Sequence, residues 1–309
     1  MKRREFIQKS TGAAFAVGTA LSVPGIIKAG KKAGSSNMLP YDLVAAKGGD
    51  PIEMFNQSIA SLGGMKSFVK ANQTVVVKPN IGWDKLPELA ANTNPYLVGH
   101  IIKHCFSAGA KKVYVFDHTC DEWTRCYTNS GIEKEVKDAG GTIVTGNSES
   151  HYQEVNIPKG KVLKTAKVHE LILESDVFIN VPVLKSHGGA KLSLSMKNLM
   201  GIVWDRRTYH REDLQQCIAD FATYERKPDL NVVDGYRVMK RNGPRGVSQA
   251  DVTMMKCQIL STDIVAADAA ATKFFGWEPK DLKHVVLAEE LGVGTADLDS
   301  LNINRINIS

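Results

Sequence analysis

Short apolar runs rich in β-branched residues alternate along this chain with stretches of helical periodicity. Residues 75–77 and 113–116 are typical of buried strands, and the helix expected after Asn94-Pro95 separates them. Strands that alternate with helices predict an α/β fold, with a mostly parallel sheet and helices on both faces in three layers. Further strands are expected at residues 41–46, 142–144, 177–181, 230–233, 256–261 and 303–308.

The expected domain organisation follows from length and composition. The chain has 309 residues, of which 43% are hydrophobic, and the roughly 280 that follow the N-terminal segment can bury one large core. No tract rich in Pro, Gly and Ser, no block of charge and no internal repeat divides them. We therefore expect a flexible segment over residues 30–40 and a single α/β domain over residues 41–309.

The first 29 residues have the pattern of an export signal. Lys-Arg-Arg-Glu-Phe-Ile-Gln-Lys at residues 2–9 precedes a weakly apolar run over residues 11–27, which predicts a twin-arginine signal. Gly18, Pro24 and Gly25 interrupt the run, whereas a stable membrane span needs about 20 mostly apolar residues. We expect the twin-arginine translocase as a partner during export and a periplasmic location, with membrane anchoring if the signal is not cleaved. The alternative is a surface helix of a cytosolic protein.

The charge balance argues against nucleic acid as a partner. The whole chain has a formal net charge of +6, but residues 1–29 hold five basic residues and one acidic residue, which leaves +2 for the rest. A nucleic-acid-binding protein is expected to carry a clustered basic face, and a net charge this small does not indicate one.

The cysteine spacing makes an iron–sulfur cluster unlikely, because it matches neither a ferredoxin pattern nor a zinc ribbon. Cys120 and Cys126 are the local pair that could form a disulfide in an oxidising compartment, and the odd total leaves at least one thiol free. The five cysteines are Cys105, Cys120, Cys126, Cys217 and Cys257.

Polar residues follow four of the expected strands. Ligands of open α/β sheets bind outside the carboxyl ends of the strands, so these groups predict a single site if the strands are parallel. The alternative is that polar residues only mark where strands meet water. The groups are Lys78-Pro79-Asn80, Asp117-His118, Lys185-Ser186-His187 and Asp234-Gly235.

The stretch 180–201 is the richest in chemical groups. Its apolar run ending at Leu184 predicts a buried strand that continues into a loop at residues 185–189, and residues 192–201 are compatible with a helix. Lysines and asparagines gathered there are suited to holding a phosphate or carboxylate, and a desolvated Lys185 or Lys78 could act as a nucleophile. The alternative is a solvated lysine face. The candidate catalytic residues are Lys185, His187 and Lys197, and the candidate substrate-binding residues are Lys78, Asn80, Asn198 and Arg207.

Two further features bear on ligands. The segments 205–210 and 242–246 are expected to be loops that could fold over the ligand. A metal ion is possible, although carboxylates and imidazoles from separate strand ends have no diagnostic spacing. The candidate metal ligands are Asp117, His118, His187, Asp234 and Asp268.

Five segments of the sequence carry a family resemblance: residues 76–80, 109–117, 180–187, 197–201 and 263–268. They resemble the domain of unknown function 362 family, and the resemblance extends over about residues 41–294. Some members of that family carry a ferredoxin segment with clustered cysteines, which this sequence lacks, so their electron-transfer role is not implied here. The resemblance implies one domain and one site, and it supplies no reaction.

Two classes of function follow. The first is an exported enzyme that binds a small anionic substrate, a phosphate or a carboxylate, at the carboxyl ends of the strands. The second is a non-catalytic protein that carries a metal or cofactor or takes part in its maturation.

Overall fold

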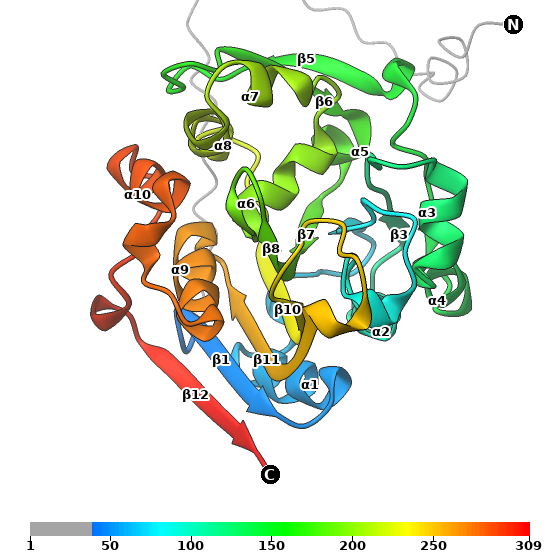
Figure 1. Cartoon of the computed structure of the whole chain (residues 1–309). Coiled ribbons are helices and arrows are strands. Elements are labelled where there is room, and N and C mark those ends of the chain that lie inside the picture. The colour runs from blue at the N-terminus through cyan, green and yellow to red at the C-terminus, as the bar shows by residue number, and fades with distance from the viewer. Residues whose placement is uncertain (1–38) are drawn as a thin grey trace, which may run out of the picture. The chain divides into compact units, whose positions relative to one another are not determined.

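A mixed, mostly parallel sheet forms the centre of the computed structural model, which describes residues 39–309 (Figure 1). The strand order is β12-β1-β11-β10-β7-β2-β3-β4, in which β11 alone runs antiparallel to its neighbours. The strands of this path are β1 (Leu43–Gly48), β2 (Thr74–Pro79), β3 (Lys112–Val115), β4 (Thr142–Ile143), β7 (Val177–Val181), β10 (Leu230–Met239), β11 (Val252–Ser261) and β12 (Ile303–Ile308).

Helices cover both faces of this sheet. Alternate residues of β2 face opposite hydrophobic cores, with Val76 in one and Val75 and Val77 in the other. The core on the Val75 side includes residues of α1 (Pro51–Ser61), α2 (Pro95–Ser107), α3 (Trp123–Asn129) and α4 (Ile132–Asp138). The core on the Val76 side includes residues of α5 (Glu170–Glu174), α6 (Ser195–Asn198), α7 (Arg207–Arg211), α8 (Leu214–Ala222), α9 (Ile264–Phe275) and α10 (Lys283–Glu290).

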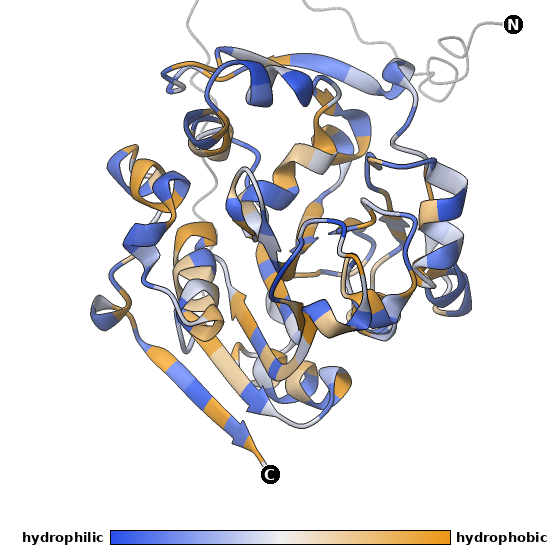
Figure 2. Cartoon of the chain, viewed as in Figure 1, coloured by the Kyte–Doolittle hydropathy of each residue, from blue (hydrophilic) through white to orange (hydrophobic). Residues whose placement is uncertain are grey.

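The prediction of an α/β fold with a mostly parallel sheet is confirmed. Figure 2 shows hydrophobic residues along the central strands and hydrophilic residues on the outer turns of the helices. No helix within residues 39–309 has both the length and the apolar character needed to cross a bilayer. Short 3-10 helices at Met65–Ser67, Pro87–Leu89, Glu149–His151, Leu199–Ile202, Gln249–Asp251, Pro279–Asp281 and Leu298–Ser300 complete the helical structure.

The expected export signal lies outside the described residues, as does most of the expected flexible segment 30–40. Residues 39–309 belong to one compact unit. Helix starts follow local sequence rules, because Asn94 and Asp263 cap α2 and α9 by accepting bonds from the first free backbone amides.

The stretch after β7 differs from the expected strand, loop and helix. After Pro182 the chain forms a second strand, β8 (Val183–His187), which pairs with β10 and, in a hairpin, with β9 (Lys191–Ser193). Lys185 therefore lies inside a strand opposite Ser193, and the predicted loop at residues 185–189 is wrong in its first part. The helix expected over 192–201 is reduced to α6 and a 3-10 helix, because residues 192 and 193 are taken up by the hairpin.

Two other expectations need correction. The strand expected at residues 230–233 continues as β10 to Met239, so Asp234 lies within a strand rather than at its end. Residues 207–211 form α7 instead of part of a loop. A separate two-stranded sheet of β5 (Tyr152–Asn156) and β6 (Thr165–His169) lies beyond α7 in Figure 1.

Candidate anion-binding site

A cavity of about 460 Å³ lies at the carboxyl ends of β2 and β3 and along β8. Five lysine and arginine residues line it, and Asp117 is the only carboxylate among the lining residues. The cationic residues are Lys78, Lys185, Lys197, Arg206 and Arg207. Excess positive charge at a concave wall favours an anionic ligand.

Lys78 is fully buried and already has an anionic partner. Its Nζ lies 2.9 Å from Asp117 Oδ1 and donates a hydrogen bond of 2.8 Å to Asn198 Oδ1. Burial lowers the pKa of Lys78, while the Asp117 carboxylate opposes that shift. Asp117 Oδ2 also accepts a bond of 2.6 Å from the Ile81 amide, so this ion pair joins β2 to the end of β3.

Lys185 is 1% exposed and has neutral partners only. Its Nζ donates to Asn80 Oδ1 at 3.0 Å and to the Ala91 carbonyl. Burial lowers the pKa of Lys185 to about 7, and the nearby Lys197 ammonium acts in the same direction. A substantial fraction of Lys185 is therefore an unprotonated amine at neutral pH.

Lys197 is the partly buried cation of this cavity that lacks a partner among residues 39–309. It lies in α6, is partly buried, and makes no hydrogen bond or ion pair within the part of the chain that the structure describes. Burial lowers the pKa of Lys197 to about 8. A partly desolvated ammonium without a counter-ion is stabilised by a bound anion.

The predicted substrate-binding amides are engaged by the protein. Asn80 Nδ2 donates to Asn198 Oδ1 at 3.2 Å, and Asn198 Nδ2 donates to Asn180 Oδ1 at 2.8 Å. Because Asn80 and Asn198 also accept from Lys185 and Lys78, they orient the two ammonium groups at the cavity wall.

Gly201 has a steric reason to be glycine. A Cβ at this position would lie 1.9 Å from Asp117 Oδ1 and 2.5 Å from Lys78 Nζ. The Lys-Asn-x-x-Gly segment 197–201 therefore supplies a cavity lysine, an orienting amide and the close backbone approach that admits the ion pair.

His187 lines the cavity as a neutral imidazole. Its Nδ1 accepts bonds of 3.0 and 3.1 Å from the amides of Gly189 and Ala190, and burial lowers the pKa of His187 to about 3. That ring nitrogen stabilises the turn of the β8–β9 hairpin, and the Gly189 amide is used there rather than left free for an anion. Arg207 is exposed at the cavity and has no hydrogen bond or ion pair among residues 39–309.

The five predicted metal ligands do not form one cluster. Asp117, His118 and His187 line the cavity, whereas Asp234 and Asp268 do not. Asp234 accepts bonds from the amides of Asn94 and Tyr236, and Asp268 accepts from Ser195 and Met196 at the start of α6. Within residues 39–309 no three His, Cys, Asp or Glu side chains gather as a metal site.

Sequence reasoning did not single out Arg206, His210 or Cys120 as site residues, although all three line the cavity. It placed the first two only in the segment 205–210, which was expected to fold over the ligand. The Arg206 guanidinium donates to the carbonyls of His118 and Thr119 at 2.6 and 2.7 Å. The sequence signal that could have indicated Arg206 is its position next to Arg207, a predicted substrate-binding residue.

The suspected disulfide between Cys120 and Cys126 is wrong, because both are free thiols in the structure. Cys120 is exposed, with its Sγ 3.5 Å from Arg206 Nη1. Cys126 lies in α3 and is buried in the core on the Val75 side of the sheet.

The sequence matches the family described as Domain of unknown function (DUF362) over residues 75–273. This chain belongs to that family. All residues that line the cavity fall within the matched range, so the site of this DUF362 protein lies in the part that defines the family.

A relative and two solved structures are similar to this DUF362 protein. The thylakoid-associated protein sll1697 of Synechocystis sp. is 24% identical over 247 residues, which cover 75% of this chain and 72% of that protein. The lactate racemase apoprotein from Thermoanaerobacterium thermosaccharolyticum is 12% identical, with a TM-score of 0.47 over 75% of this chain and 56% of that one. A Thermotoga maritima protein is 11% identical, with a TM-score of 0.46 over 78% and 60%. The chain thus spans less than two thirds of both solved structures.

Proposed function

We propose that this DUF362 protein is an enzyme that binds a small phosphate- or carboxylate-bearing substrate in the cationic cavity, after export by the twin-arginine route. The observation that carries the proposal is Lys197, which has no partner among residues 39–309, in a cavity whose one lining carboxylate is already paired with Lys78. An incoming anion completes the charge balance of that wall.

In this proposal Lys197 and Lys185 have different roles. Lys197 holds the anionic group of the substrate. Lys185, with a pKa of about 7, supplies an unprotonated amine that accepts a proton from the substrate or attacks it as a nucleophile. Asn80 orients that amine, and Lys78 with Asp117 keeps the two strand ends together.

Titration calorimetry with phosphate and with acetate tests the binding step. We expect Lys197→Met to weaken binding of at least one of these anions by about tenfold or more, because one charge-assisted contact is lost. Lys103→Met is the matched control, since Lys103 is an exposed lysine of α2 outside the cavity. Equal affinities of the two variants, or no binding by the unmodified chain, would overturn the proposal.

Lys185→Met separates an enzyme from a carrier. With a panel of phosphate esters and carboxylic acids, an enzyme loses turnover while anion binding at Lys197 persists. A protein that only carries its ligand shows no turnover in either form and changes only in ligand stoichiometry.

A further inference from the structure

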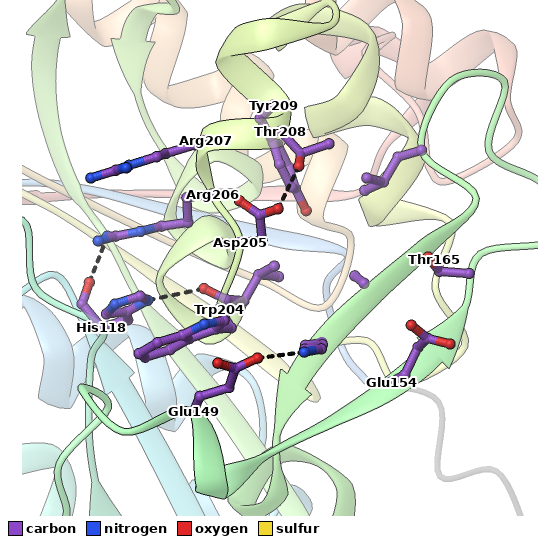
Figure 3. Close-up of a pocket in the computed structure, with 14 residues that line it drawn as sticks. His118, Glu149, Glu154, Thr165, Trp204, Asp205, Arg206, Arg207, Thr208 and Tyr209 are labelled. Atoms are coloured by element: carbon purple, nitrogen blue, oxygen red, sulfur yellow. Dashed lines mark hydrogen bonds and ion pairs between the residues drawn. The ribbon is translucent and has the colours of Figure 1, made fainter.

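A second groove, of about 670 Å³, adjoins the cationic cavity (Figure 3). His118, Arg206 and Arg207 line both spaces, so the two share a wall. The far side of the groove is formed by the β5–β6 sheet, which contributes Glu154 and Thr165. A ligand held at the lysines therefore has room to extend past the shared wall.

The floor of this groove is a fixed aromatic surface. The Trp204 ring lies parallel to the His118 ring, with an interplanar angle of 4° and 4.8 Å between centroids. The Trp204 amide donates to the Lys167 carbonyl at 3.0 Å, and Val203 bridges to Val168, so the segment is tied to β6. Trp204 nevertheless remains partly exposed. Such a ring offers a flat surface for stacking.

Tyr209 lines this groove with a buried side chain. It is 1% exposed, and its hydroxyl has no hydrogen-bond partner among residues 39–309. Figure 3 shows its ring extending from α7 towards the groove that it lines. Because the hydroxyl oxygen is itself enclosed, Tyr209 contributes to the lining of the groove without offering that hydroxyl to a ligand.

The groove differs from the cavity in charge. Glu149 is paired with Lys167, and Glu154 and Asp205 offset the two arginines of the shared wall. Leu163, Ala166 and Val203 are buried apolar residues in its lining. A balanced polar rim over an apolar and aromatic floor suits the uncharged body of a ligand.

We propose that the substrate has two parts, an anionic group held in the cationic cavity and a planar ring that lies in the groove against Trp204. This inference rests on the proposed function, because it takes the anionic group to be bound at Lys197. The chemical class is an aryl phosphate or an aryl-substituted carboxylate.

Affinities of the full chain for four probes test the inference. Phenyl phosphate is compared with phosphate, and phenylacetate with acetate, by titration calorimetry. We expect the ring-bearing probe of at least one pair to bind about tenfold more tightly, as a stacked ring can provide. Trp204→Ala should abolish that preference while leaving the affinity for phosphate and acetate unchanged. Because Trp204 also packs on His118, Trp204→Phe keeps a flat ring there and should retain most of the preference.

The outcomes are distinguishable. Equal affinity within both pairs overturns the two-part substrate and leaves anion binding standing. A ring preference that survives Trp204→Ala at full size overturns the role of the groove. If none of the four probes binds, the proposed function fails and this inference fails with it.

Discussion

Two aspartates and two lysines near the same sheet differ in whether the fold supplies them with hydrogen-bond partners. Asp234 and Asp268 are each buried and accept two backbone amide bonds, so their carboxyl oxygens are used within the fold. Lys185 has neutral partners only, and Lys197 has none among the described residues. The comparison teaches that a charge near a strand end indicates a ligand site only when the fold leaves it unpaired.

Removing a paired group should therefore change stability, and removing an unpaired group should change binding. The predictions below test this contrast, beginning with the largest expected effect.

Gly201→Ala should lower the free energy of unfolding by about 3–5 kcal/mol, because the added Cβ displaces the buried Lys78–Asp117 pair. Gly188→Ala is the matched control, since a Cβ there meets no atom of the described chain within 4 Å. Urea unfolding measures both variants. A Gly201→Ala protein as stable as the Gly188→Ala protein would show that the ion pair does not hold the strand ends together.

Asp268→Asn should destabilise the fold by about 2 kcal/mol, because one of the two amides that Asp268 binds at the start of α6 loses its acceptor oxygen. Lys197 directly follows the two residues that supply those amides, Ser195 and Met196. Lys197→Met should leave the free energy of unfolding unchanged or raise it, since it removes an ammonium that is unpaired among the described residues. Chemical denaturation of the two variants side by side gives the comparison. The reverse order of stabilities would contradict the assignment of paired and unpaired groups.

The affinity for sulfate, which does not titrate near neutral pH, should fall by about tenfold between pH 7 and pH 9. Lys197, which holds the anion, has a pKa of about 8 and loses its proton in that window. Lys185, with a pKa of about 7, loses the part of its charge that remains at pH 7. Calorimetry across the window measures the change, and Lys103→Met should behave as the unmodified chain does. An affinity that is constant or rises with pH would exclude binding by these ammonium groups.

The lowered pKa values of Lys185 and Lys197 also predict that the free energy of unfolding of the ligand-free protein rises with pH, whereas the affinity for sulfate falls. The folded-state pKa of each lysine lies below its unfolded value, so the unfolded chain binds more protons between about pH 7 and pH 10. The contribution of these lysines to the free energy of unfolding therefore rises with pH in that range. Lys185→Met should reduce the rise, as measured by denaturation at several pH values.

The smallest expected effect is that of Tyr209→Phe, which should change the free energy of unfolding by less than about 1 kcal/mol. The hydroxyl that is lost has no hydrogen-bond partner in the described part of the chain. Tyr127→Phe is the matched control. Its hydroxyl, equally buried, bonds the amide and carbonyl of Asp117 at 2.6 and 2.9 Å, and its loss should destabilise by about 1–2 kcal/mol. Thermal unfolding distinguishes the two, and equal losses would show that the Tyr209 hydroxyl is bonded in solution.

Much of the fold could be predicted from sequence because the pattern of strands and helices is local. Residues 75–77 and 113–116 are apolar runs flanked by helical periodicity, and their parallel pairing carries Lys78 and Asp117 to the same edge of the sheet. The hairpin after Pro182 could not be predicted in this way, because its pairing with β10 depends on a segment about 50 residues further along the chain.

The members of the candidate site were predictable, but their partners were not. Lysines 78, 185 and 197 look alike in sequence, and only the fold gives the first an aspartate and leaves the last without a partner. The Trp204 groove depends on a backbone bond to β6, which no local pattern indicates.

Alkylation of Cys120 tests the central claim, that the cavity captures small anions. Cys120 is the exposed cysteine at the cavity, and the other four are buried. Its rate of reaction with iodoacetate, divided by the rate with neutral iodoacetamide, is measured by mass spectrometry and compared with the same ratio for glutathione. The account predicts a higher ratio at Cys120 that falls in Lys197→Met and in the presence of phosphate. A ratio equal to that of glutathione and unaffected by Lys197→Met would contradict it.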